Sequence, residues 1–426
     1  MSLMGKEEIL LCLVLATNAF RNLFCEKDKE DQVKVSESVV FYAKSHDPWQ
    51  AWPVKREHME ANLLVKTLKL FDKAGAKDMI EKGDKVAIKV HVGEAFNYRY
   101  LRPEFVACLV RKIKEYGGRP FLTDTTGLGV RARDYGGGVV TFNRRIALNH
   151  IEVARSHGYC EEVTGAPFIP ADGMYGLDGL EINLENALRN KRVFIAKLFV
   201  DADKVILATH FKGHGAAGFG GSLKNLGVGC VTKTSKWLAH CLEPPEITEA
   251  CNGCGDCIDA CLGDCITIEE GKAVINYELC VMCGGCMEVC KEDGAIKVKG
   301  ANDEQFSVGF ADNARGVIGA IGPGNLFYFN FALDIVSQCD CYPVPGTPIV
   351  PDIGVFASKD PVAIDRACVD AVISAPGLRG SPAEEKDALD PGVDKFVKIH
   401  DVQWKHHVEA SERLGVGSQK YELKEV

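Results

Sequence analysis

Eight of the eighteen cysteines lie in two short runs that share one spacing, C-x-x-C-x-x-C-x-x-x-C. The runs consist of Cys251, Cys254, Cys257 and Cys261, followed by Cys280, Cys283, Cys286 and Cys290. An iron–sulfur cluster is held by several thiolates around one inorganic core, and a short loop with this spacing brings them together. The two runs therefore predict two iron–sulfur clusters and a protein that carries electrons.

Zinc is the main alternative for grouped cysteines. Zinc sites usually use two C-x-x-C pairs that lie far apart, whereas each run here has four cysteines. The grouping also differs from a disulfide framework, so we expect a reducing compartment. Most of the other cysteines are interpreted as ordinary thiols: Cys12, Cys25, Cys108, Cys160, Cys230, Cys241 and Cys368.

A second candidate site is the glycine-rich segment 209–229, which follows a predicted strand. Its small residues would let backbone N–H groups approach an anion, and lysines add positive charge. Histidines there could exchange protons near neutral pH or ligate a metal. We predict that catalysis uses His210, His214, Lys212 and Lys224, and that Gly218, Gly220 and Gly221 lie against a cofactor or ligand. The alternative is a structural turn whose histidines are satisfied in the core.

The same segment contains Gly213-x-Gly215-x-x-Gly218, which formally matches a dinucleotide-binding fingerprint. We do not expect a dinucleotide, because no acidic residue lies near twenty positions further on and additional glycines interrupt the expected helix. Other polar residues follow predicted strands. His91 and Glu94 follow one strand and Asp124 and Thr125 another, so the strand ends would bring them near His210. We predict that His91, Asp124 and Thr125 also bind the cofactor or ligand.

Cys339-Asp340-Cys341 follows an apolar stretch and could join this group. A metal or reactive-thiol role competes there with two small buried cysteines beside a capping aspartate. Asp360 and Asp365 are expected to cap or decorate a helix.

Strand and helix patterns alternate around these residues. We expect strands at 85–92, 120–124, 193–196, 204–209, 326–336 and 352–358, and helices at 104–116, 144–157 and 361–373. This rhythm predicts an α/β fold, with a mixed or parallel sheet and helices on both faces. The predicted divisions are an N-terminal helix or linker (1–35), an α/β domain in two parts (36–242 and 301–375), an inserted α+β ferredoxin-like cysteine module (243–300) and a helical extension (376–426).

The cysteine module resembles bacterial-type two-cluster ferredoxins, in its cysteine runs and in the hairpin pattern around Glu270-Gly271. The resemblance implies two [4Fe–4S] clusters, one held by Cys251, Cys254, Cys257 and Cys290 and the other by Cys280, Cys283, Cys286 and Cys261. Leu262 and Lys291 replace the proline that usually follows each run, which would alter solvent access to the clusters. Cys265 stands where these ferredoxins carry a small core residue, so we interpret it as packing.

Two further resemblances concern the α/β domain. The 209–229 segment resembles the His-rich, Gly-Gly-x-Lys segment in the N-terminal domain of nickel-dependent lactate racemases. More broadly, the chain is similar to a family of iron–sulfur proteins of unknown function, which carry a related α/β domain with a ferredoxin inserted. The matching stretches begin at Lys89, Leu122, Thr209, Cys339 and Asp352.

Net charge and hydropathy restrict the partners. The formal net charge of −9 argues against nucleic acid, and no stretch is long and apolar enough to span a bilayer. Residues 9–20 have the length of a signal-peptide core, but the residues before them are net acidic. We therefore expect a cytoplasmic protein, with export through this segment as the alternative.

Three functions fit these patterns. The first is a ferredoxin-containing oxidoreductase that passes electrons to a small anionic substrate or cofactor in the α/β cleft. Lys212 and Lys224 would hold the anion, and His210 or His214 would move a proton. The second is an electron carrier or accessory protein that docks a redox partner protein. The third is racemase-like proton transfer assisted by an additional metal.

Overall fold

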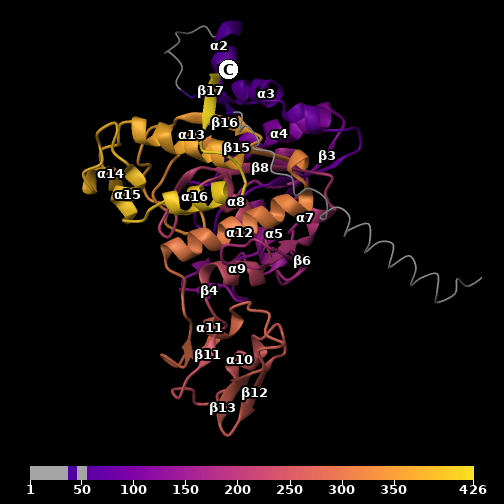
Figure 1. Cartoon of the computed structure of the whole chain (residues 1–426), viewed down its shortest axis with the longest axis vertical. Helices are drawn as coiled ribbons and strands as arrows, with labels where there is room; N and C mark the ends of the chain where they lie inside the picture. Colours follow the sequence, from indigo (N-terminus) through magenta and orange to yellow (C-terminus); the bar gives the residue numbers. More distant parts are fainter. Residues whose placement is uncertain (1–36, 46–54) are drawn as a thin grey trace, which may run out of the picture. The chain divides into compact units, whose positions relative to one another are not determined.

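The computed structural model describes residues 37–45 and 55–426 (Figure 1). The predicted N-terminal helix or linker and the apolar segment at 9–20 lie outside these residues. Among the described helices, none combines the length and the apolar character needed to cross a membrane.

The central element is a seven-stranded mixed sheet with the order β17-β1-β16-β15-β8-β2-β3. β3, β2, β8 and β15 run parallel, whereas β16 is antiparallel to both β15 and β1. The strands are β1 (Ser38–Lys44), β2 (Lys85–Lys89), β3 (Arg119–Thr123), β8 (Lys204–His210), β15 (Leu326–Ala332), β16 (Gly354–Ser358) and β17 (Tyr421–Glu425). The predicted α/β fold with a mixed sheet is confirmed.

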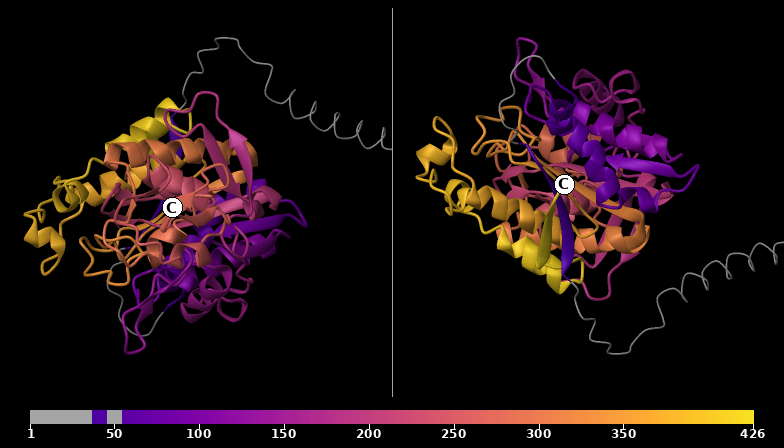
Figure 2. Two further views of the ribbon diagram at one scale, coloured as in Figure 1. Left: turned by 90° about the horizontal axis from the view of Figure 1, so that it is seen from below. Right: turned by 90° about the horizontal axis from the view of Figure 1, so that it is seen from above.

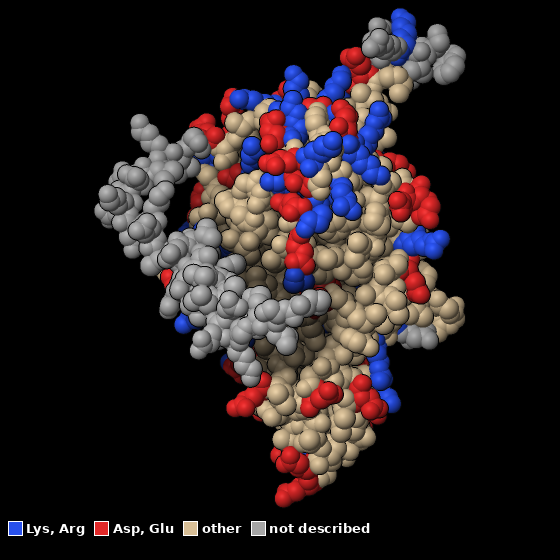
Figure 3. Space-filling model, turned by 90° about the vertical axis from the view of Figure 1, so that its right-hand side faces the viewer, with Lys and Arg blue, Asp and Glu red and all other residues tan. Residues whose placement is uncertain are grey.

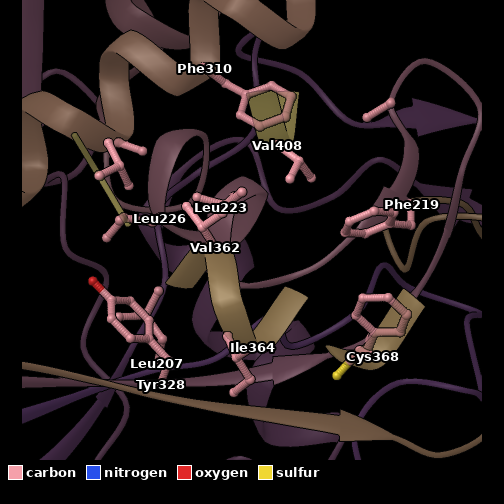
Figure 4. Packing of buried hydrophobic residues seen from close by; sticks show 14 of the residues in the cluster. Leu207, Phe219, Leu223, Leu226, Phe310, Tyr328, Val362, Ile364, Cys368 and Val408 are labelled. Carbon is pink, nitrogen blue, oxygen red and sulfur yellow. The ribbon is translucent and has the colours of Figure 1, made fainter. Parts of the chain in front are cut away.

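Two hydrophobic cores cover the two faces of the sheet, because side chains alternate along each strand. On β15, Phe327, Phe329 and Phe331 enter one core, while Tyr328 enters the other. Figure 4 shows the second core, in which Leu207 and Tyr328 lie close to side chains from the covering helices.

The first face is covered by α3 (Leu63–Lys73) and α4 (Pro103–Glu115), with α5 (Ala147–Ser156) alongside. The second face is covered by α8 (Ser222–Gly227), α12 (Asp303–Ile321), α13 (Pro361–Ser374) and α16 (Lys405–Arg413). In Figure 2, early helices (indigo) and late helices (yellow) accordingly lie on different sides.

Shorter elements complete the α/β body. The helical ones are α2 (Arg56–Ala61), η1 (Ala76–Met79), α6 (Glu161–Thr164), α7 (Lys197–Asp201), α9 (Lys233–His240), η2 (Pro323–Asn325), α14 (Pro382–Glu385) and α15 (Lys395–His400). The small strand pairs are β4 (Arg133–Asp134) with β5 (Val140–Thr141), β6 (Gly179–Asn183) with β7 (Arg192–Ala196), and β9 (Lys212–His214) with β10 (Gly218–Gly220).

The cysteine module leaves the body after α9 and returns before α12 (Figure 1). It contains β11 (Glu246–Ile247), α10 (Asp256–Asp259), β12 (Ile266–Glu269), β13 (Lys272–Ile275), α11 (Gly285–Val289) and β14 (Ile296–Lys297). β12 and β13 form the predicted hairpin, in which Glu270 and Gly271 both have positive φ, as a tight two-residue turn requires. Cysteines contribute much of the module's small core.

Two expectations about local structure were wrong. The helix predicted from residue 144 begins at Ala147, because Arg144 turns inward to pair with buried carboxylates. The C-terminal extension is not purely helical, since β17 pairs in parallel with β1 as the edge strand of the sheet (Figure 2, right). Trp404 and Val408 of the extension are buried in the second core.

Candidate functional site

A cavity of about 340 Å³ lies at the carboxyl ends of β2, β3 and β8. β3 lies on one side of β2 and β8 on the other, so the chain order changes direction between β2 and β8. Open α/β sheets bind ligands at such a switch point. Lys89, Asp124 and His210, from the ends of the three strands, all line the cavity.

Buried ion pairs form part of the cavity wall. Lys89 Nζ lies 2.9 Å from Asp124 Oδ1, and Arg144 Nε lies 3.3 Å from Glu94 Oε2. Burial alone would raise the pKa of Asp124, but Lys89 and His150 hold it well below its usual value. Asp124 therefore stays ionised, and cations lie beside both carboxylates.

His210 is held by two acceptors. Its Nδ1 lies 3.0 Å from Asp340 Oδ1, and its Nε2 lies 2.8 Å from the Leu333 carbonyl oxygen. Both ring nitrogens are therefore in contact with oxygen atoms of the protein. The catalytic role of His210 stays a prediction, which this geometry does not favour because both ring nitrogens already contact protein oxygens.

The two predicted lysines differ. Lys212 Nζ lies 3.0 Å from Asp340 Oδ2 and donates to the His210 carbonyl, so its charge is already matched. Lys224 lines the cavity, is partly exposed, and forms no hydrogen bond or ion pair within the described part of the chain. Of the two, Lys224 is the ammonium that is available to an anion, and the anion-holding role of either lysine stays a prediction.

Three other histidines line the cavity. His214 Nδ1 accepts from the Ala216 N–H (3.2 Å), so a neutral ring carries its proton on Nε2. Burial and the Lys224 charge lower the pKa of His214 to about 4. His91 Nδ1 likewise accepts from Gly93 (3.0 Å), and burial followed by the Arg144 charge lowers its pKa. Both rings are therefore neutral hydrogen-bond donors at pH 7.

His240 has the opposite arrangement. Its Nδ1 lies 2.7 Å from the Lys236 carbonyl oxygen and donates to it, which leaves Nε2 as an acceptor. Burial lowers the pKa of His240 to about 4. Four further residues line the cavity that the sequence did not predict there. His240 and Lys236 come from α9, and Arg144 and Arg145 precede α5. The sequence around Arg144 and Arg145 predicts only a helix, and no local motif marks any of the four residues as part of a site.

The predicted glycines have different surroundings. Gly220 and Gly221 line the cavity, but Gly218 does not. Gly218 has a φ of 76°, and a Cβ there would lie 2.8 Å from Trp404 Cβ. Gly221 is required by Asp365, whose carboxylate accepts from the N–H groups of Ser222 and Leu223 at the start of α8. The prediction that Gly218 contacts a ligand is therefore corrected to a packing role.

The remaining predicted residues also lie at the cavity. Thr125 Oγ1 accepts from Lys236 Nζ (2.6 Å) and donates to the Gly229 carbonyl (2.9 Å). Cys339 and Cys341 contribute to the wall, while Asp340 between them is fully buried. Asp360 caps α13 as expected, accepting from Val362 and Ala363.

Two small cavities in the cysteine module are each surrounded by four of the eight cysteines. Cys251, Cys254, Cys257 and Cys290 line one, and Cys261, Cys280, Cys283 and Cys286 line the other, together with Cys265. Each set draws three cysteines from one run and one from the other, which is the grouping implied by the ferredoxin resemblance. Their role as ligands stays a prediction.

No group of three or more His, Cys, Asp or Glu within residues 37–45 and 55–426 is placed to hold one metal ion. A [4Fe–4S] core has four irons, each of which takes one thiolate, so its cysteines surround a cavity and do not meet at a point. Backbone N–H groups of Ala273 and Cys265 also point at Cys251 and Cys261 sulfurs (3.4 and 3.3 Å), as thiolates require.

The second of these cavities is attached to the wall of the large one. Gly129 N donates to the Cys283 carbonyl oxygen (2.8 Å), and Leu128 lines the large cavity. Arg145, another wall residue, pairs with Glu288 of α11, which also accepts from Val130 N (2.6 Å). Residues 127–131 therefore connect the lining of the cationic cavity to the cysteine module through hydrogen bonds.

These features define an α/β protein with a ligand cavity at the carboxyl edge of a mixed sheet and an inserted cysteine module. Residues 86–370 match the family model described as "Domain of unknown function (DUF362)". The chain belongs to this family.

Other similarities are more limited. A Porphyra purpurea protein, described as an uncharacterized protein in the rpl9-rpl11 intergenic region, is 39% identical over 57 residues, which are 12% of this chain and 76% of that protein. The lactate racemase apoprotein from Thermoanaerobacterium thermosaccharolyticum is 13% identical (TM-score 0.34, 95% of this chain and 85% of that one). A Thermotoga maritima protein is 11% identical (TM-score 0.31, 86% and 60%).

Proposed function

We propose that this chain is an iron–sulfur oxidoreductase that delivers electrons to a small anionic substrate in the cationic cavity. The observation that carries the proposal is the hydrogen bond from Gly129 N to the Cys283 carbonyl oxygen (2.8 Å), because Leu128 beside Gly129 lines the cationic cavity and Cys283 lines a cysteine cavity. Two [4Fe–4S] clusters bound by the eight cysteines would supply low-potential electrons at this contact. The protein would then position the acceptor and control protons.

The charge around the cavity favours an anion. Six cationic side chains line it, against two carboxylates: Lys89, Arg144, Arg145, Lys212, Lys224 and Lys236, with Glu94 and Asp124. Ion pairs within the protein neutralise most of the cations, so the free Lys224 ammonium is the anchor for a carboxylate or phosphate. Neutral His214 and His91 would donate hydrogen bonds to the bound anion.

The cysteine module has the charge expected of a docking surface for an electron donor. It carries twelve Asp and Glu residues against four lysines, so most of the chain's net charge of −9 lies there. Glu269 and Glu270, in the hairpin of β12 and β13, are exposed. Figure 3 shows acidic side chains at the end of the module farthest from the α/β body. A donor protein with a basic surface would be attracted to it, and the encounter rate would fall as salt increases.

An anaerobic turnover assay tests the proposal. The reduced holoprotein is incubated with cell-extract anions, and mass spectrometry identifies the compound consumed. We expect one class of small anion to be reduced by the wild-type protein, but not by Cys283→Ser, which lacks a ligand of the cluster beside the cavity. Consumption that persists in Cys283→Ser would contradict the proposal.

An electron carrier is the second candidate, and the acidic module favours it. A carrier would pass electrons from donor to partner with no need of the cavity, so Lys224→Ala would transfer electrons at the wild-type rate. Racemase-like chemistry with an additional metal stays a third possibility. It predicts a stoichiometric transition metal besides iron, and metal analysis of the purified protein decides it.

A further inference from the structure

Cys339 and Cys341 lie together on a tight turn at the cavity wall. The Tyr342 N–H donates to the Cys339 carbonyl oxygen (2.9 Å), which closes the turn over Asp340 and Cys341. The Cys341 N–H is directed at Cys339 Sγ (3.5 Å). The two sulfurs therefore belong to one short loop that faces the space in which a ligand would lie.

Buried polar contacts fix this turn from both ends. The Asp340 carboxylate is held by His210 and Lys212, at 3.0 Å each, and its carbonyl accepts from Glu94 N (2.8 Å). Asn97 Nδ2 donates to the Tyr342 carbonyl (2.8 Å). Through the Asp340 carboxylate, His210 and Lys212 thus hold the Cys-Asp-Cys turn at the cavity.

The surroundings of the two cysteines favour a thiolate on Cys339 and a protonated thiol on Cys341. A hydrogen bond from Cys341 lowers the pKa of Cys339 well below its usual value, and Lys224, His214 and His91 add to this against the effect of burial. The Cys339 thiolate and burial in turn raise the pKa of Cys341 well above its usual value. One thiolate beside one thiol is the reduced state from which a disulfide forms.

We propose that Cys339 and Cys341 form a dithiol–disulfide couple that collects electrons from the cysteine module and passes them, as a pair, to a small anionic disulfide held at Lys224. The source of the electrons rests on the proposed function. An iron–sulfur cluster transfers one electron at a time, whereas reduction of a disulfide needs two electrons. A dithiol–disulfide couple between the clusters and the substrate would collect two single electrons and transfer them as a pair.

The chemistry balances in both directions. Reduction of the couple breaks the Sγ–Sγ bond, takes up two electrons and one proton, and leaves a thiolate on Cys339 and a thiol on Cys341. In the other direction the Cys339 thiolate attacks a substrate sulfur and releases the first thiolate. Cys341 then loses its proton and attacks Cys339 Sγ, which restores the internal disulfide and releases the second thiol.

The experiment uses the full chain, purified and handled without oxygen, with cystine as the probe because it is a small disulfide that carries carboxylates. The reduced protein is mixed with cystine, alkylated and digested, and mass spectrometry reports the state of the 339–341 peptide. The oxidised protein is also titrated reductively while its iron–sulfur absorbance is followed. Cys339→Ser and Cys341→Ser are the test variants, and Cys108→Ala, which removes a thiol outside the cavity, is the matched control.

We expect cystine to convert the peptide to an internal disulfide in wild type and in Cys108→Ala. Oxidised wild type should then take up one electron for each cluster and a further pair, whereas Cys339→Ser with the same iron content takes up only the cluster electrons. Two free thiols after cystine treatment, or equal electron uptake in both proteins, would overturn the couple. A protein without iron would instead overturn the proposed function, and the cystine reaction would still decide the couple.

Discussion

Replacement of Lys224 by alanine tests whether the cavity holds an anion. Lys224 is the cavity-lining ammonium without an internal partner among the described residues, so a bound anion would complete its hydrogen bonding. A hydrogen bond to a charged group contributes about 1.5–3 kcal/mol. At about 1.4 kcal/mol per factor of ten, the variant should bind the anion roughly ten- to a hundredfold more weakly.

Isothermal titration calorimetry with oxalate and with inorganic phosphate, at low salt, measures this change. Lys224→Arg should keep most of the affinity because it keeps the charge. Lys359→Ala, an exposed lysine outside the cavity, is the matched control and should bind as the wild type does. Lys224 forms no ion pair with a carboxylate in the described part of the chain, so the thermal midpoint of Lys224→Ala should stay close to that of the wild type; the charge of Lys224 instead helps to lower the pKa of Cys339.

The reasoning is refuted if Lys224→Ala binds both anions within twofold of the wild type. It is also refuted if Lys359→Ala loses affinity as much as Lys224→Ala does, because the effect would then reflect net charge and not the cavity.

Three further predictions concern stability and the module. Iron removal by a chelator should expose the amides of 243–300 to hydrogen exchange while the sheet stays protected, because so small a core depends on its metal; continued protection of the module would contradict this. Glu288→Gln should speed exchange at 128–131 and destabilise the contact with Arg145 by about 1–3 kcal/mol, whereas Glu292→Gln, at an exposed site, should not. Burial lowers the pKa of His407 to about 3, so the unfolded chain binds a proton first as the pH falls below about 6.5. The free energy of unfolding should therefore be about 2 kcal/mol lower at pH 5 than at pH 7. Denaturant titrations at the two pH values should show a smaller decrease for His407→Leu than for the wild type.

The sheet and the cysteine module were accessible to sequence reasoning because their signals are local. Helical periodicity located α4 to within a residue or two, and the apolar stretch at 326–336 contained β15. β17 was missed because its sequence is mostly charged, and it is a strand only because β1 offers an edge to pair with.

The cavity was partly predictable for the same reason. Polar residues that follow parallel strands lie at one edge of the sheet. The sequence therefore predicted that Asp124 and His210 lie near each other, and both line the cavity. The partners of each side chain could not be predicted, because they come from distant parts of the chain. Asp340, which is 130 positions from His210, contacts its Nδ1, so this histidine holds the turn that carries Cys339.

The central claim is that the eight cysteines hold two clusters beside a cavity that receives their electrons. Anaerobic purification followed by iron and acid-labile sulfide analysis, with electron paramagnetic resonance of the reduced protein, tests it most directly. We expect about eight irons and eight sulfides per chain, and an electron paramagnetic resonance spectrum of two interacting [4Fe–4S]⁺ clusters. Zinc in place of iron, or iron without sulfide, would contradict it.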